Sequence, residues 1–161
     1  MKKYLLILLL ISSGAIARAQ AISFYDLTNL ANLSNGEAHN YLTLGKVFKH
    51  LYLEEKDGKK LERFRSVNPK QKEQTVTIGV NTVLSSGGVL RTVTYTTRDP
   101  QHIYNLIAQA KRNRMEMRFE GADADNNIYI FDNDFYHVAM YVSNKHGNGL
   151  IRVDQKEFVA Y

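Results

Sequence analysis

Two segments of the chain carry apolar residues at the spacing of an amphipathic helix, and each begins with a helix cap. In "SNGEAHNYLTLGKVF", Ser34 is the expected N-cap and Glu37, three residues later, completes a capping box. In "DPQHIYNLIAQAK", Asp99 is the cap and Pro100 takes the first helical position. The apolar positions i, i+3, i+4 and i+7 are Ala38, Tyr41, Leu42 and Gly45 in the first segment, and Ile103, Leu106, Ile107 and Ala110 in the second. The pattern therefore predicts two helices whose caps are 65 residues apart.

After each helix the apolar period changes to two, which is the period of a strand. Four such segments follow the first helix: "LYLEE", "LERFRSV", "TVTIGVNTV" and "GGVLRTVTYTT". Four more follow the second: "MEMRFE", "NIYIFD", "FYHVAMYV" and "GNGLIRVDQKEF". In "MEMRFE" we expect the apolar face to hold Met115, Met117 and Phe119, and in "FYHVAMYV" we expect it to hold Tyr136, Val138, Met140 and Val142.

The same order of five elements in both halves predicts an α+β fold made by tandem duplication of a helix followed by about four antiparallel strands. The repeats would span about 34–97 and 98–161, with the helices packed on one face of the sheet. Chance likeness between short amphipathic segments is the alternative. The pattern leaves open whether the two sheets join edge to edge or through their faces. Residues 21–33 have no counterpart in the second half, although Leu27, Leu30 and Ala31 suggest a short helix.

The order of elements resembles the tandem-repeat fold of the β-lactamase inhibitor proteins, and more loosely the small envelope lipoproteins of the outer-membrane assembly machinery. It is also similar to that of many secreted Gram-negative proteins of unknown function. The resemblance concerns element order, so it implies a fold and an inhibitor-like binding role but assigns no binding residue. The chain lacks the cysteine that lipoproteins carry.

The N-terminal segment "MKKYLLILLLISSGAIARAQ" is typical of a secretory signal peptide, with Lys2 and Lys3 before an apolar run and an A-x-A site that ends at Ala19. The run is shorter than the roughly 20 apolar residues of a membrane span. We therefore predict a signal peptide over 1–19, a single domain over 20–161 without a transmembrane segment, and a secreted or periplasmic location in a Gram-negative envelope. The chain has no cysteine and hence no disulfide.

Cleavage changes the charge balance of the protein. It removes three of the 21 basic residues and no acidic one, so 18 basic residues face 16 acidic ones and the net charge falls from +5 to +2. The excess of positive charge expected of a nucleic-acid-binding protein is then mostly gone, and we do not expect nucleic acid as a partner.

Several catalytic motifs are absent from the chain: a cysteine nucleophile, "GxSxG", "GxxxxGK" and "HExxH". His50, His137 and His146 lie in different segments, and we expect His39 and His102 to be exposed residues of a first helical turn. The sequence predicts neither a metal nor another cofactor.

The acidic stretch "DADNNIYIFDNDFYH" has two functional interpretations. Asp123, Asp125 and Asn127 follow the spacing of a calcium loop, but Ile128 stands where that loop requires glycine. Turn chemistry around a strand is the interpretation that we favour. Alternatively, Asp132 or Asp134 with His137 could form the general acid and base of a small envelope hydrolase.

The leading functional hypothesis is a non-enzymatic binding or inhibitor-like module that engages an envelope protein through an exposed sheet face. Tyrosine and arginine are enriched at interface hot spots, although tyrosine is also a common strand residue. The candidate partner-binding residues are Tyr95, Arg91, Arg152 and Tyr141. A third hypothesis is a structural or assembly partner at the outer membrane, which would need a free sheet edge or an apolar patch. The oligomeric state stays open.

Overall fold

The computed structural model describes residues 22–56, 58–68 and 72–158, so the predicted signal peptide lies outside the described residues. The described part contains three helices, α2 (Phe24–Asn32), α3 (Asn35–Leu44) and α4 (Pro100–Arg112). It contains eight strands: β1 (Phe48–Lys56), β2 (Lys59–Ser66), β3 (Gln74–Val83), β4 (Val89–Thr97), β5 (Glu116–Ala122), β6 (Asn126–Asp132), β7 (Tyr136–Ser143) and β8 (Gly149–Gln155). In this part of the chain, no helix combines the length and the hydropathy needed to cross a bilayer.

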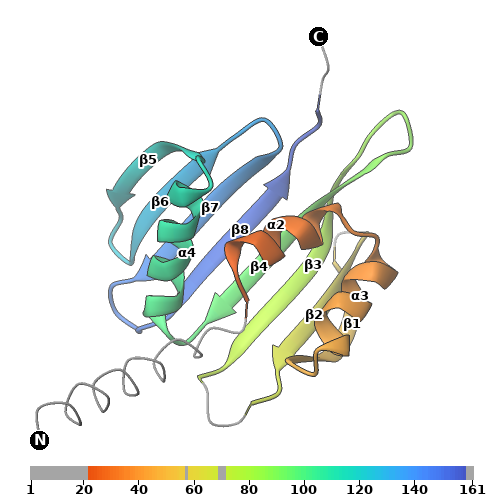
Figure 1. The fold of residues 1–161 in the computed structure, drawn as a ribbon, viewed down its shortest axis with the longest axis horizontal. Helices are drawn as coiled ribbons and strands as arrows, with labels where there is room; N and C mark the ends of the chain where they lie inside the picture. The colour runs from red at the N-terminus through yellow and green to blue at the C-terminus, as the bar shows by residue number, and fades with distance from the viewer. Residues whose placement is uncertain (1–21, 57, 69–71, 159–161) are drawn as a thin grey trace, which may run out of the picture.

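All eight strands belong to one antiparallel sheet with the order β1-β2-β3-β4-β8-β7-β6-β5 (Figure 1). The last strand of each half forms the centre, where β4 pairs with β8 and places Val93 opposite Val153 and Tyr95 opposite Ile151. The predicted α+β class is confirmed, and the two halves join edge to edge. A continuous sheet results, with β1 and β5 as its edges.

The helices begin where their caps predict. The Ser34 side chain accepts a hydrogen bond from the Glu37 backbone N–H, and the Glu37 carboxylate accepts one from the Ser34 backbone. At α4, the Asp99 side chain accepts from the Gln101 backbone N–H, and Pro100 holds the first helical position. The suggested helix within residues 21–33 is also present as α2.

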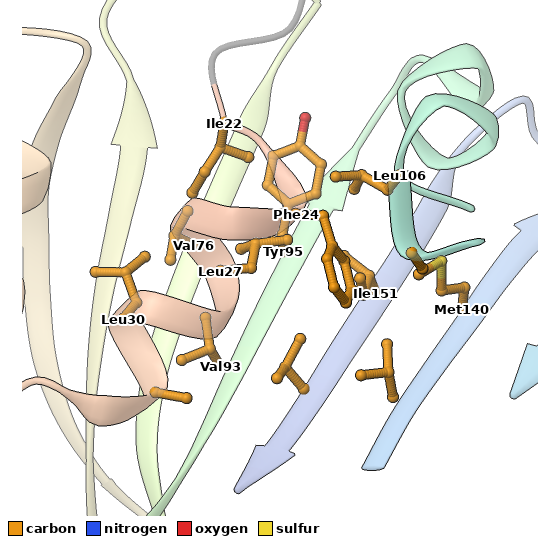
Figure 2. Close-up of a cluster of buried hydrophobic side chains, with 14 of the residues drawn as sticks. Ile22, Phe24, Leu27, Leu30, Val76, Val93, Tyr95, Leu106, Met140 and Ile151 are labelled. Atoms are coloured by element: carbon orange, nitrogen blue, oxygen red, sulfur yellow. The ribbon is translucent and has the colours of Figure 1, made fainter. Parts of the chain in front are cut away.

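Buried apolar residues of the helices and of the strands form one core cluster, and we call the sheet face that carries these strand residues the inner face. Its strand residues include Val76, Val93, Tyr95, Met140 and Ile151, each fully buried. Figure 1 draws the helices in front of the sheet, with α2 in contact with β4 and β8, α3 with β1, and α4 with β7 and β8. Figure 2 shows Phe24, Leu27 and Leu30 of α2 in one cluster with residues of the two central strands, Val93 and Tyr95 of β4 and Ile151 of β8. The helix α2 therefore covers the junction of the two halves.

The alternation that the sequence predicts holds in β7 and is broken in β5. In β7, Val138, Met140 and Val142 are buried. In β5 a bulge between Met117 and Phe119 inserts one extra residue, which reverses the direction of every following side chain. Phe119 therefore pairs with Ile130 and is 47% exposed, so its predicted place on the apolar face was wrong.

Candidate functional site

The side chains that alternate with the core positions lie on the opposite face of the sheet, which we call the outer face. Along the central strands they include five half-buried threonines, Thr75, Thr77, Thr92, Thr94 and Thr96. The Thr75 and Thr96 hydroxyls are hydrogen-bonded to each other across the strands. The centre of the outer face is thus a band of small side chains that combine a methyl group with a hydroxyl.

The two flanks of this band differ in chemistry. On the first-half side, Arg63 and Arg65 lie beside the threonines, and the Arg63 guanidinium stands 5.3 Å from the centre of the Tyr52 ring. On the second-half side the residues are mainly apolar, with Ile130 and Ile128 paired opposite Ala139 and Tyr141. The outer face therefore offers cationic and aromatic groups on one flank and aliphatic and aromatic groups on the other.

A groove of about 560 Å³ lies where the central strands reach one end of the sheet. Thr96, Tyr141 and Leu150 line it from the outer face, together with Asn126 and Arg98. The Arg98 guanidinium is 3.5 Å from the Glu73 carboxylate, which also lies 3.8 Å from Arg65. The groove is consequently a mixed polar and apolar depression with both signs of charge at its border.

Two of the four predicted partner-binding residues lie at the centre of the outer face. Arg152 pairs with Thr94 on one side and with Ala139 on the other, and its side chain is half exposed. Its Nε donates a hydrogen bond of 2.9 Å to Asp154. Tyr141 lies one strand away and lines the groove.

Tyr95 lies on the inner face, so the prediction that it belongs to an exposed surface was wrong. The period of two in β4 places Tyr95 on the same side as Val93, and its side chain is fully buried. Its hydroxyl donates a hydrogen bond of 2.8 Å to Gln74 Oε1, and burial raises the pKa of Tyr95.

Arg91 belongs to the inner side of β4 as well. It is two residues before Val93 and half buried, and its Nε has no hydrogen-bond partner among the described residues. Its backbone N–H donates to the Gln155 side chain at 3.1 Å. Arg91 is therefore not part of the outer face that carries Arg152.

The predicted acid–base residues come together only in part. Asp132 and His137 face each other across β6 and β7, with His137 Nδ1 3.1 Å from Asp132 Oδ1. Lys156 Nζ also lies 3.7 Å from this carboxylate, while Asp134 is exposed in the turn between the strands. None of the three lines the groove, so the pair has no substrate cavity around it there.

Two of the three candidate calcium residues, Asp123 and Asp125, belong to the turn between β5 and β6. Asp123 Oδ1 accepts hydrogen bonds from the backbone N–H groups of Asp125 and Asn126, at 2.8 and 2.6 Å. These two bonds lower the pKa of Asp123. Asp125 pairs with Lys145, and Asn127 is a residue of β6. Asp123 thus acts as a turn former, and Asn127 belongs to a strand, which agrees with the turn interpretation.

Two histidines differ from their predicted exposure. His102 is 3% exposed, and its Nδ1 lies 3.1 Å from the Tyr95 hydroxyl and 3.0 Å from that of Thr97. His102 Nε2 is buried without a hydrogen-bond partner among the described residues, and burial lowers the pKa of His102. His39 is only half exposed, because its ring packs against those of His50 and Phe64.

The residues that sequence reasoning missed are His39, His50 and Glu62, from α3, β1 and β2. His39 Nδ1 lies 2.6 Å from Glu62 Oε1, and His50 Nε2 lies 3.4 Å from the same oxygen. The sequence contains a signal for Glu62: it lies two residues before the core residue Phe64 in the same strand, so both side chains belong to the same face of the sheet. The approach of the two histidines depends on tertiary packing.

Comparison with known proteins found no match to the chain among family models, curated proteins or solved structures. The function must therefore be inferred from the residues and their arrangement.

Proposed function

We propose that this protein is a non-enzymatic binding module, secreted or periplasmic in a Gram-negative envelope, that engages a protein partner through its outer sheet face. The observation that carries the proposal is the asymmetry of the sheet. The helices contact inner-face residues, whereas Tyr141, Arg152 and the threonine band lie on the other side of the same strands.

The dimensions of the outer face suit a protein better than a small molecule. Eight strands about 4.8 Å apart give a surface roughly 35 Å wide. A strand of about seven residues gives roughly 20 Å in the other direction, so the face offers about 700 Å². That area is close to the roughly 800 Å² that each partner buries in a standard protein complex.

The chemistry of the face also favours a protein partner. Tyrosine and arginine supply large contact areas together with polar groups, and both are frequent among hot-spot residues. Tyr141 and Arg152 occupy the centre, where surrounding contacts can exclude water from them. The groove beside Tyr141 would receive a side chain or loop tip of the partner.

The sheet edges favour binding through the face over binding by strand addition. β5 presents Glu116, Arg118 and Glu120 and contains a bulge, and β1 contains a bulge between His50 and Tyr52. Charged residues and bulges at an edge oppose pairing with another strand. This weakens the alternative of an assembly partner that docks by its edge.

We also propose that the two halves arose by tandem duplication, as in the inhibitor-like architecture that the element order resembles. Each half has a helix followed by four strands, and in each half the first of these strands carries a bulge. The mirrored strand order around β4 and β8 supports the same origin.

The test measures partner binding with matched surface variants. The protein is used as bait in an envelope extract of its host, and the protein recovered is purified and titrated against Tyr141→Ala and Arg152→Ala. Tyr25→Ala and Arg112→Ala are the controls, because Tyr25 and Arg112 are exposed residues of α2 and α4.

We expect each outer-face variant to weaken binding by roughly tenfold or more, as hot-spot truncations do, and the helix variants to bind like the wild type. Equal losses in both pairs, or losses confined to the helix variants, would contradict the proposed surface. Turnover of a substrate by the purified protein, abolished by Asp132→Asn or His137→Ala, would favour the hydrolase alternative.

A further inference from the structure

Three side chains with metal-binding atoms converge at the first-half end of the sheet. His39, His50 and Glu62 each offer one ligand atom, and these three atoms all lie within 4.8 Å of one another. We call these three residues the His39–His50–Glu62 cluster. Three separate elements supply them: α3, β1 and β2.

Their spacing is close to that of ligands around a small divalent ion. Zinc binds histidine nitrogen and carboxylate oxygen at about 2.0–2.2 Å, which puts two ligands of a tetrahedral site about 3.4 Å apart. The distance from His50 Nε2 to Glu62 Oε1 is 3.4 Å. The distance from His39 Nδ1 to the same oxygen is 2.6 Å, so this pair would separate by less than an ångström to admit an ion.

The surroundings hold the rings in place. Phe64, fully buried in the core, contacts His39 and His50 edge-on, with ring centres 5.6 and 5.4 Å away. The two imidazole centres are 5.2 Å apart. Because Phe64 is two residues from Glu62 on β2, the strand that supplies the carboxylate also supplies the wall behind the imidazoles.

The burial of the Glu62 carboxylate favours a cationic partner. Glu62 is 8% exposed on the inner face, where it pairs with Ile78, and removing a carboxylate from water is costly unless it is paired. The side chains of His39 and His50 are 40% and 35% exposed. The Glu62 carboxylate is therefore buried, whereas the two imidazoles are partly exposed to solvent.

We propose that His39, His50 and Glu62 bind one divalent first-row transition metal ion of the zinc type. Two imidazole nitrogens and one carboxylate oxygen are the donor set of an open zinc site, which keeps a further position for water or another ligand. Coordination through His39 Nδ1 uses the tautomer that carries its proton on Nε2. The cluster is on the helix side of the sheet, so it is independent of the proposed outer-face function.

The test is a titration of the untagged, EDTA-treated protein with Zn²⁺ by calorimetry, repeated with His39→Ala, His50→Ala and Glu62→Gln. His137→Ala is the matched control, because His137 also faces a carboxylate, at 3.1 Å, but belongs to no group of three metal-binding side chains among the described residues. Far-UV circular dichroism of each variant establishes that it is folded.

We expect one equivalent of Zn²⁺ to bind to the wild type and to His137→Ala, and the affinity to fall at least tenfold in each cluster variant. With Co²⁺ as a spectroscopic probe, the wild type should give visible d–d bands whose intensity falls in Glu62→Gln. This second readout also applies if one histidine variant fails to fold. No stoichiometric binding, or binding that only His137→Ala weakens, would overturn the assignment.

Discussion

Replacement of Gly149 by alanine tests how closely α4 approaches the centre of the sheet. A Cβ atom at this position would lie 2.4 Å from Ile103 Cγ1 and 3.2 Å from the Tyr141 carbonyl oxygen. Favourable contacts between carbon atoms begin near 3.5 Å, so the Ile103 side chain would have to move by about an ångström. Ile103 is fully buried, and a β-branched side chain has essentially one rotamer in a helix. The added methyl group would therefore push α4 away from β8.

The size of the effect follows from two opposing contributions. Overpacking a well-filled core costs about 1–3 kcal/mol, and loss of glycine freedom in the unfolded chain returns about 0.4–1 kcal/mol. We expect Gly149→Ala to lower the free energy of unfolding by about 1–2 kcal/mol. Ile103→Ala alone should cost about 2–5 kcal/mol, and the double variant should cost less than the sum, since the new cavity accepts the methyl group.

The assay is urea unfolding followed by far-UV circular dichroism, because the chain has no tryptophan. Gly36→Ala is the control: Gly36 is an exposed residue of α3 with open space around its Cβ position, so the same change should be neutral or slightly stabilising. Wild-type stability of Gly149→Ala, or strictly additive effects in the double variant, would refute the described packing of α4 on β8.

Three further predictions concern stability. Burial lowers the pKa of His102 below its ordinary 6.5, so the unfolded chain binds the proton first as the pH falls below about 6.5, and the free energy of unfolding should decrease there. In urea titrations at each pH, His102→Asn should show a smaller decrease. Ser34→Ala removes one half of the capping box of α3 and should cost about 1 kcal/mol in the same assay, and an unchanged midpoint would argue against the cap. Tyr95→Phe removes a buried hydrogen-bond donor to Gln74, so it should lower the free energy of unfolding by about 1–2 kcal/mol and leave partner affinity unchanged. A variant of wild-type stability with weakened partner binding would instead indicate that Tyr95 belongs to the interface.

Local signals account for the parts of the fold that the sequence predicts well. Ser34 and Asp99 determine where two helices begin, because a cap acts on backbone groups within its own turn. Apolar periodicity is also a property of each segment by itself, so it predicts the order of helices and strands. The pairing of β4 with β8 joins segments about 60 residues apart, and nothing in either segment alone specifies that partner.

The candidate site was predicted less well, for two different reasons. The error at Tyr95 was avoidable, since the period of two in β4 puts Tyr95 with Val93 and opposite the threonines. The error at Phe119 was not, because the bulge that turns it outward has no marker in "MEMRFE". The His39–His50–Glu62 cluster needs the β1–β2 register and the position of α3 together, and both are tertiary properties.

The most direct test of the proposed outer-face function is site-specific photo-crosslinking in the host. A photoreactive phenylalanine analogue is placed at Thr94 or Leu150 on the outer face, and at Tyr25 or Lys111 on the helix side. We predict that the outer-face positions yield one discrete crosslinked protein and that the helix-side positions yield none of it. The same adduct from both sides, or from the helix side alone, would contradict binding through the outer face.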